Sequence, residues 1–357
     1  MKKILYLINY AGSGGSEKYV RMMAESAAKE GCEVFFAYWE KGRLSEYMEE
    51  KGIKSFRIEM RSPFDIKAAR RLAEICKKEG IDTVHVQFPR ENCIAVLSRI
   101  FYRVRVIYTC HLLYPPTAVW SVINRLITPF DSRIIAVCQA VKRLLAAGGI
   151  KKDSIDVIYN GIDVRDMKKR DRDIRELHGI DKDAFLCVTL GRYTAEKGFD
   201  YLVRVLERLK GQAVCVIVGE GPMMGDIKAE IEKRGLEKTV IQAGYTDNVA
   251  NYLESADLAI NSSSSEAFSF AILEGCAKGL PTVATDVGGN GELLRSFNLA
   301  GEIVPFGDEE AMADKILRLK NDAELRKEYS QNAVRNIAEH FNTEKMISET
   351  LKIYKEN

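Results

Sequence analysis

The chain has 357 residues, of which 46% are apolar and 29% are charged, and its formal net charge is +2. This length exceeds what one hydrophobic core usually organises, so we expect a globular protein with two domains. No apolar run approaches the roughly 20 residues that span a bilayer, which argues against an integral membrane protein.

The eight cysteines occur singly, without the close pairs of metal or redox motifs, as is typical of free thiols in a reducing cytosol. We therefore expect a soluble, cytoplasmic protein. Residues 1–165 contain 27 Lys and Arg against 18 Asp and Glu, whereas the remainder contains 26 against 33. The basic first half could attract the inner face of a membrane or a phosphorylated acceptor. Solvated helix faces explain the same charges equally well, and we expect no nucleic-acid partner.

Short apolar runs alternate with segments of helical periodicity, a pattern typical of parallel sheets covered by crossover helices. Strands are predicted in the first half at residues 3–8, 33–38, 83–86, 104–109, 134–137 and 156–159. Helices are predicted at residues 17–30, 66–78, 93–101 and 140–147.

The segment 166–182 is almost entirely charged and is predicted to be a connector. Strands then resume at residues 185–190, 213–218, 240–242, 258–261 and 282–285, and the tail from about 308 to 355 is helical. We predict an α/β fold with two Rossmann-like, doubly wound domains, 1–165 and 183–340. The last segment, 341–357, is predicted as a helix that returns to the first domain. Ligands of such folds bind outside the carboxyl ends of the strands.

A glycine-rich loop, residues 12–17, follows the first predicted strand and opens the first helix, where a ligand can approach the backbone closely. Glu17 stands where a dinucleotide fingerprint needs its third glycine, which disfavours NAD binding. The alternative is a tight turn with Ser16 as the helix cap.

The loop after the first strand of the second half, residues 191–198, contains two cations. Arg192 can grip a phosphate with two parallel hydrogen bonds, and Lys197 supplies a point charge. Taken alone, a solvated Arg and Lys on a surface loop would be the better explanation.

Glu266 and Glu274 stand eight residues apart in the segment that follows a predicted strand and a serine-rich loop. On one helix they would be roughly 12 Å apart along the axis. This exceeds the separation of a hydrolase acid and base pair, so we expect them to hold two parts of an extended ligand. Alternatively, Glu266 caps the helix and Glu274 is an ordinary exposed residue.

Glu266-x7-Glu274, preceded by Gly191-Arg192-x4-Lys197, resembles the retaining glycosyltransferases of family 4, in the glycogen-synthase-like group. The resemblance covers essentially the whole chain. Further motifs in the matching order are Gly14-Gly15-x-Glu17, Asn160-Gly161-Ile162-Asp163, Gly219-Glu220-Gly221-Pro222 and Gly288-Gly289.

The resemblance implies a GT-B fold, with domains facing each other across a cleft, in which the second domain binds the nucleotide and the first binds the acceptor. Arg192 and Lys197 would neutralise the departing diphosphate in place of a metal. Glu274 would hold the ribose, and Glu266 the transferred sugar. Backbone donors at Phe268, Ser269 and Phe270 would assist, while Gly14, Gly15 and Glu17 would approach the donor. Ser269 stands where similar enzymes often have glycine or proline, which leaves the choice of sugar open.

His111 follows a predicted strand, where similar enzymes place a histidine against the donor sugar, so we predict a catalytic role for it. His85 also lies near a strand end and is the rival candidate. His178 and His340 fall in the connector and the tail, where we expect solvent exposure.

Two short acidic pairs, Asp171 with Asp173 and Asp181 with Asp183, match the motif of metal-dependent transferases. Both lie in the connector, where no apolar strand aims the carboxylates, so we expect no metal and no other cofactor.

The stretch 112–126 is rich in large apolar residues and contains Pro115-Pro116. It could be an acceptor flap, a shallow membrane contact or an ordinary core helix.

The predicted function is metal-independent, retaining transfer of a hexose-type sugar to a glycan, lipid-linked or small-molecule acceptor in cell-envelope or exopolysaccharide synthesis. The resemblance alone implies a UDP-sugar donor before a GDP-sugar, and no residue of the sequence decides between them. A sugar-nucleotide epimerase of the same architecture and a catalytically inactive binding partner are the alternatives.

Overall fold

The computed structural model describes residues 2–12, 14–113 and 117–356, and the chain divides into two compact units. Unit 1 comprises Met1–Asn160 and Met346–Asn357, and unit 2 comprises Gly161–Lys345. Unit 1 thus ends at Asn160 rather than at 165, and the segment 166–182 groups with unit 2. The end of the chain, from Met346 on, packs with unit 1.

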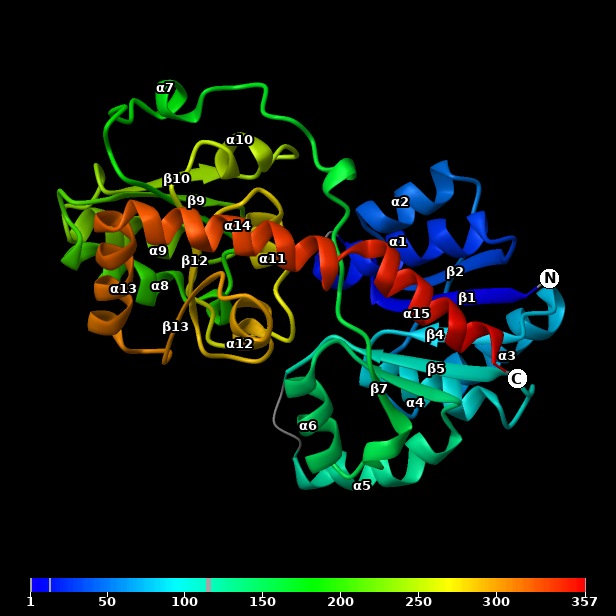
Figure 1. Cartoon of the computed structure of the whole chain (residues 1–357). Coiled ribbons are helices and arrows are strands. Elements are labelled where there is room, and N and C mark those ends of the chain that lie inside the picture. Colours follow the sequence, from blue (N-terminus) through cyan, green and yellow to red (C-terminus); the bar gives the residue numbers. More distant parts are fainter. Residues whose placement is uncertain (1, 13, 114–116, 357) are drawn as a thin grey trace. The chain divides into compact units, whose positions relative to one another are not determined.

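Unit 1 contains, in its described residues, a seven-stranded parallel sheet of order β3-β2-β1-β4-β5-β6-β7, covered by helices (Figure 1). The strands are β1 Lys3–Tyr10, β2 Glu33–Glu40, β3 Lys54–Arg57, β4 Thr83–Val86, β5 Arg105–Cys110, β6 Arg133–Ala136 and β7 Ile155–Val157. The helices are α1 Gly15–Lys29, α2 Arg43–Glu50, α3 Ile66–Glu79, α4 Pro89–Ser98, α5 Ala118–Ile127, α6 Gln139–Ala147 and α15 Thr343–Lys355, the last of which begins in unit 2.

Unit 2 contains a six-stranded parallel sheet of order β10-β9-β8-β11-β12-β13 in its described residues. The strands are β8 Leu186–Leu190, β9 Val214–Val218, β10 Val240–Gly244, β11 Leu258–Asn261, β12 Thr282–Thr285 and β13 Gly301–Val304. The helices are α7 Ile174–His178, α8 Phe199–Arg208, α9 Met224–Lys233, α10 Ala250–Leu253, α11 Phe270–Ala277, α12 Asn290–Arg295, α13 Glu309–Asn321 and α14 Ala323–Glu339.

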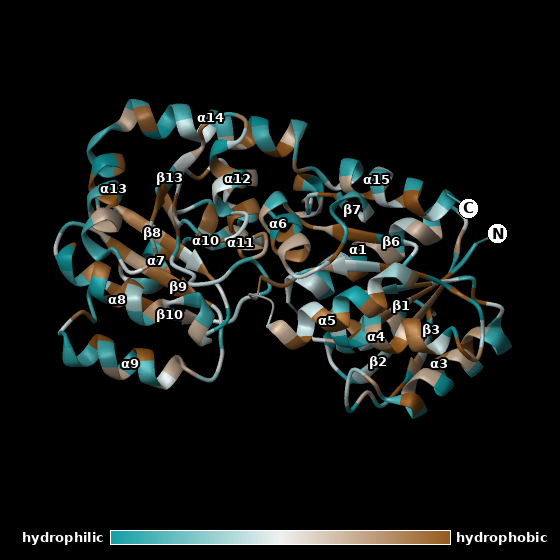
Figure 2. Cartoon of the chain, turned by 90° about the horizontal axis from the view of Figure 1, so that it is seen from below, coloured by the Kyte–Doolittle hydropathy of each residue, from teal (hydrophilic) through white to brown (hydrophobic). Residues whose placement is uncertain are grey.

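The central strands are continuous apolar runs because helices cover both faces of each sheet. Residues 4–8 of β1 are fully buried, and Leu186 to Val188 of β8 are nearly so. Figure 2 shows these strands as hydrophobic, whereas most helices alternate between hydrophobic and hydrophilic residues. The core of each unit therefore lies between its sheet and the apolar faces of its helices.

The sequence pattern misses two strands and two helices. β3 is an edge strand whose residues are exposed or half-buried, so it lacks the apolar run of a central strand. β13 starts at a glycine, α2 has only eight residues, and α7 lies inside the predicted connector. β3 and β13 are stabilised by pairing with a neighbouring strand. This pairing depends on residues elsewhere in the chain, so the residues of β3 and β13 alone do not predict it.

Both sheets have a topological switch point, which is where ligands of such folds bind. In unit 1, β1 lies between β2 and β4, and in unit 2, β8 lies between β9 and β11.

All eight cysteines are free. Among the described residues, none of the helices combines the length and apolar character needed to cross a bilayer.

Candidate functional site

Two loops at the carboxyl ends of β8 and β11 interlock in unit 2. The backbone N–H of Ser264 donates to Glu196 O at 2.8 Å, and Ser262 Oγ donates to Lys197 O at 2.9 Å. Gly198 has a φ of +63°, and a Cβ atom there would stand 2.2 Å from Ser262 O. Only glycine fits this position without a shift of the backbone, so the close approach of the two loops is built into the sequence.

This contact brings together two of the predicted residues, Lys197 and Glu266. Lys197 Nζ lies 2.5 Å from Glu266 Oε1, and the two side chains are 22% and 12% exposed. Ser263 Oγ donates to the same carboxylate oxygen at 3.0 Å. The ammonium is thus fixed at the carboxyl edge of the sheet, close enough to solvent to meet a ligand.

Arg192 lies on the first of these loops but points to solvent. Its side chain is 63% exposed, and its nearest acidic partner is Glu196 Oε1 at 3.7 Å. A second glycine contact supports the loop, because a Cβ atom on Gly219 would lie 1.9 Å from Gly191 O. Tyr193 also donates its N–H to Glu220 O at 3.0 Å. The backbone that carries Arg192 is therefore held against the loop after β9.

The two glutamates do not share a helix, which corrects the estimate of their separation. Glu266 lies in the loop before α11, and only Glu274 lies within this helix, where it is half-buried. Glu266 does not cap the helix either, because Ser269 is the N-cap and its Oγ accepts from Ile272 N. Phe268 is buried and packs against Phe341, and Phe270 is the first residue of the helix. The predicted backbone donors therefore lie at a helix N-terminus, which favours an anionic or hydroxyl ligand.

Asn261 contacts Glu266, with Asn261 Nδ2 3.5 Å from Glu266 Oε1, and Asn290 holds Asn261 in place; neither asparagine was predicted as a site residue. Asn290, fully buried, donates through Nδ2 to Asn261 Oδ1 at 3.2 Å and to Thr285 O at 3.1 Å. Asn261 Nδ2 in turn donates to Ser269 Oγ at 3.2 Å. Asn290 directly follows Gly288-Gly289 after a buried strand, and this position could have indicated its role.

Replacing Asn290 by alanine removes one of the two donors from each of two buried acceptors, Asn261 Oδ1 and Thr285 O, which keep the backbone N–H groups of Ser263 and Val287. We expect the free energy of unfolding to fall by about 2 kcal/mol. Urea titration of Asn290→Ala beside Asn321→Ala, an exposed asparagine of α13, measures this loss. Equal midpoints for the two variants would contradict the supporting role.

The glycine-rich loop of unit 1 leads into α1 as predicted, although Ser13 lies outside the described residues. Gly14 is the N-cap of α1, so the prediction that Ser16 caps the helix is wrong. Ser16 Oγ instead donates to Glu17 Oε2 at 2.7 Å. Gly14 and Gly15 are exposed and Glu17 is buried, which leaves the glycine backbone accessible to a ligand.

His111 directly follows β5, and Gln87, which follows β4, orients it. The His111 Nε2 and Gln87 Oε1 atoms are 3.0 Å apart, and Gln87 Nε2 donates to His85 O. This fixes the amide so that Oε1 accepts from the ring N–H. Desolvation lowers the pKa of His111 to about 3, so the ring is neutral at physiological pH. The ring of Tyr19, on α1, packs edge-on against it at 4.8 Å.

His85, the rival candidate, is a buried structural residue. Its Nδ1 lies 2.5 Å from Tyr354 Oη on α15, and its Nε2 lies 2.7 Å from Thr109 Oγ1. Because both ring nitrogens are occupied and the side chain is fully buried, His85 is closed to a ligand.

Two family models match consecutive parts of the chain. The model "Glycosyltransferase Family 4" matches residues 13–166, and "Glycosyl transferases group 1" matches residues 170–336. Together these matches leave few residues uncovered, and the matched ranges contain the glycine-rich loop, Lys197 and Glu266. The chain is a glycosyltransferase of family 4.

Two relatives are similar to this glycosyltransferase over nearly their full length. The N-acetyl-alpha-D-glucosaminyl L-malate synthase of Bacillus anthracis is 25% identical, over 99% of this chain and 97% of that protein. The N-acetylgalactosamine-N,N'-diacetylbacillosaminyl-diphospho-undecaprenol 4-alpha-N-acetylgalactosaminyltransferase of Campylobacter jejuni is 25% identical, over 99% of both chains.

Solved structures are similar in fold. The structure of HepE from Anabaena in complex with UDP and glucose has a TM-score of 0.87 and is 19% identical, over 99% of this chain and 100% of that chain. The parallel sheets and covering helices of both units are those of the predicted GT-B glycosyltransferase fold.

The other two histidines of the glycosyltransferase are half-buried, so the predicted solvent exposure is wrong for both. His340 stacks on Phe297 with ring centroids 3.6 Å apart. His178 is the last residue of α7 and packs against Tyr252. Tertiary packing of the connector and tail withdraws these rings from water.

The two acidic pairs make local contacts at the surface. Asp173 caps α7, and the backbone N–H groups of Glu176 and Arg175 lower its pKa. Asp181 Oδ1 accepts from Asp183 N at 2.9 Å. In the part of the chain that the structure describes, no three His, Cys, Asp or Glu residues are grouped as a metal site would require.

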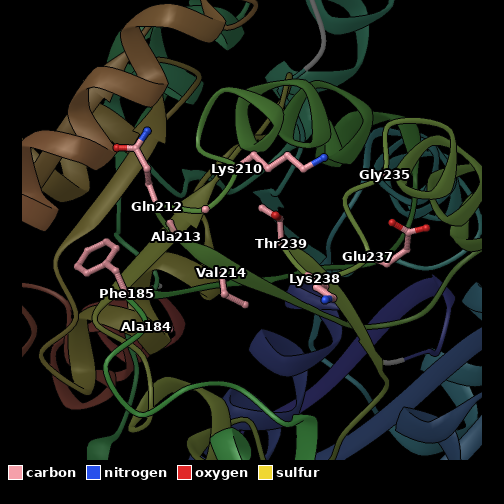
Figure 3. Close-up of a pocket in the computed structure, with 11 residues that line it drawn as sticks. Ala184, Phe185, Lys210, Gln212, Ala213, Val214, Gly235, Glu237, Lys238 and Thr239 are labelled. Carbon is pink, nitrogen blue, oxygen red and sulfur yellow. The ribbon is translucent and has the colours of Figure 1, made fainter.

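Figure 3 shows a pocket of about 670 Å³ in unit 2, and none of the residues that line it belongs to the two interlocked loops. Its lining includes Phe185, Ala213 and Thr239, which directly precede β8, β9 and β10. The pocket therefore lies at the amino ends of these strands, whereas Lys197 and Glu266 follow carboxyl ends. Ligands of parallel α/β sheets bind at the carboxyl ends, so we do not assign the donor to this pocket.

Proposed function

We propose that this glycosyltransferase moves a hexose-type sugar from a UDP-sugar to a lipid-linked or glycan acceptor, without a metal ion and with retention at the anomeric carbon. It would act in cell-envelope or exopolysaccharide synthesis, in the cytoplasm at the inner face of the membrane. Unit 2 would bind the donor, and unit 1 the acceptor.

The observation that carries this proposal is the fixed ammonium of Lys197 beside Glu266, at the switch point of the sheet of unit 2. A departing diphosphate needs positive charge, which Lys197 and the exposed Arg192 supply without a metal. Glu266 can accept hydrogen bonds from sugar hydroxyls, and Glu274 on α11 from ribose hydroxyls. Catalysis would then consist of charge stabilisation and positioning, with the acceptor attacking the face that the diphosphate leaves.

His111 would contribute as a neutral hydrogen-bonding group. Because its pKa is lowered, the ring carries no charge at neutral pH. The Nε2–H group donates a hydrogen bond to Gln87 Oε1, so Nδ1 is the acceptor nitrogen in this tautomer. The ring can therefore accept a hydrogen bond from a hydroxyl of the donor sugar.

The similar proteins support the donor and the acceptor class. HepE is described in complex with UDP and glucose, and the name of the Campylobacter relative includes a diphospho-undecaprenol acceptor. We propose the same nucleotide for this chain because unit 2 holds Lys197 and Arg192. We propose a lipid-linked acceptor because unit 1 is basic.

Donor binding is tested by thermal unfolding in EDTA with UDP, GDP and ADP. We expect UDP to raise the melting temperature, because a ligand at a hundredfold excess over its Kd stabilises the folded state by roughly 2.7 kcal/mol. Glu274→Ala should abolish the shift, whereas Glu324→Ala, at an exposed position of α14, should retain it. A shift with GDP alone would show that the donor is a GDP-sugar and not a UDP-sugar. No shift in folded protein would reject donor binding, and binding without sugar transfer would favour an inactive partner.

A further inference from the structure

Helix α5 of unit 1 presents apolar side chains to solvent. Val119, Val122 and Leu126 are 66%, 56% and 65% exposed, and Phe130, which ends the short helix after α5, is 55% exposed. Within α5 the spacing of three and four residues places the first three on one helix face. None of the residues of α5 is buried, so the prediction of an ordinary core helix is wrong. Tyr114, Pro115 and Pro116 of the same stretch lie outside the described residues.

The segment of sequence that contains this face is rich in lysine and arginine, although two of its arginines, Arg105 and Arg133, contact Glu356 near the end of the chain. Residues 92–152 include nine Lys or Arg and one acidic residue, Asp131, whose carboxylate accepts from Asn92 Nδ2 at 3.0 Å. Arg125 lies on α5 itself, and Arg99 donates to Phe130 O. Asn124 of α5 donates to Gly148 O, directly after α6, and Lys151 and Lys152 follow shortly afterwards in the sequence.

An apolar helix face with positive charge around it matches a membrane surface that contains anionic lipids. The apolar side chains can enter the boundary between headgroups and acyl chains, while lysines and arginines meet negative headgroups. A second copy of the chain fits less well, because it would bring two basic surfaces together. A single helix face is also small compared with the roughly 800 Å² per partner of a stable interface.

We propose that the exposed face of α5, formed by Val119, Val122, Leu126 and Phe130, docks on anionic membranes. The docking would hold unit 1 at the surface where a lipid-linked acceptor resides. Its biological meaning rests on the proposed function, but the docking itself requires no donor and no transfer.

The test is sedimentation of the full chain with vesicles of phosphatidylcholine alone, or with about 30% phosphatidylglycerol. We expect binding to the anionic vesicles that weakens with added salt. Val122→Ser combined with Leu126→Ser should weaken binding at least about tenfold, since each change removes buried apolar groups. Lys151→Ala combined with Lys152→Ala should weaken it on anionic vesicles only. Val334→Ser, at an apolar position of α14 in unit 2 that is 48% exposed, is the control.

Three outcomes would overturn the inference. The first is that the protein stays in the supernatant with anionic vesicles at low salt, and the second is that the α5 variants bind as the wild type does. A dimer in gel filtration that the α5 changes dissociate, without vesicle binding, would assign the face to a second copy. The UDP-induced thermal shift is measured in the same samples, so that loss of docking and failure of donor binding are separate results.

Discussion

Lys197→Met is expected to lower kcat about a thousandfold, because its ammonium supplies charge to the departing diphosphate in the transition state. Methionine keeps most of the volume of the side chain but has no charge. The effect is measured as the rate at which the nucleotide is released from the donor in EDTA, during sugar transfer or donor consumption. The same loss in EDTA and in Mg²⁺ would support charge stabilisation by the protein itself.

The ion pair requires a control for stability. Without Lys197, the carboxylate of Glu266 keeps only neutral donors such as Ser263 Oγ, and a nearly buried carboxylate without its cation destabilises the fold. The urea midpoint of each variant is therefore measured beside its kcat. Lys197→Arg should restore part of the activity, and Lys210→Met, at the amino edge of the sheet, should change neither quantity. Activity within a factor of three of wild type in Lys197→Met would remove Lys197 from the chemistry.

Glu91 should make the protein less stable as the pH rises from 5 to 8. Its side chain is fully buried on α4, and neither carboxylate oxygen has a hydrogen-bond partner in the described structure. Burial raises the pKa of this carboxyl from 4.5 to about 7. Between these values the folded state holds a proton that the unfolded state releases. Stability is thus fully present below the unfolded pKa and declines as the pH rises through about 7, by roughly 3 kcal/mol.

Glu91→Gln removes this dependence because the amide stays neutral at every pH. We expect the variant to have a higher urea midpoint than wild type at pH 8 and a similar one at pH 5. Asp131, whose pKa burial raises to about 8, gives the same sign, so part of the slope remains until Asp131→Asn is added. Glu50→Gln, on an exposed position of α2, serves as the control. A midpoint of Glu91→Gln that follows the wild type at both pH values would show that Glu91 is already ionised.

The family motifs and the alternation of strands and helices were readable from the sequence, because they depend on local order. Central strands such as β4, β11 and β12 begin and end at the predicted residues, since buried parallel strands are short apolar runs with clear ends. Lys197 and Glu266 could be selected for the same reason, as each follows a buried strand. The edge strand β3 could not, because its residues are not apolar enough.

Contacts between distant residues were decided by tertiary structure alone. The pairing of Lys197 with Glu266 depends on the adjacency of β8 and β11, and the support from Asn290 depends on that of β11 and β12. The same holds for the histidines, since the sequence places His85 and His111 alike near strand ends. Only packing against Tyr354 and Thr109 closes the first, while Gln87 orients the second. The sequence thus determined the chemistry that each loop offers, and the order of the strands decided which loops meet.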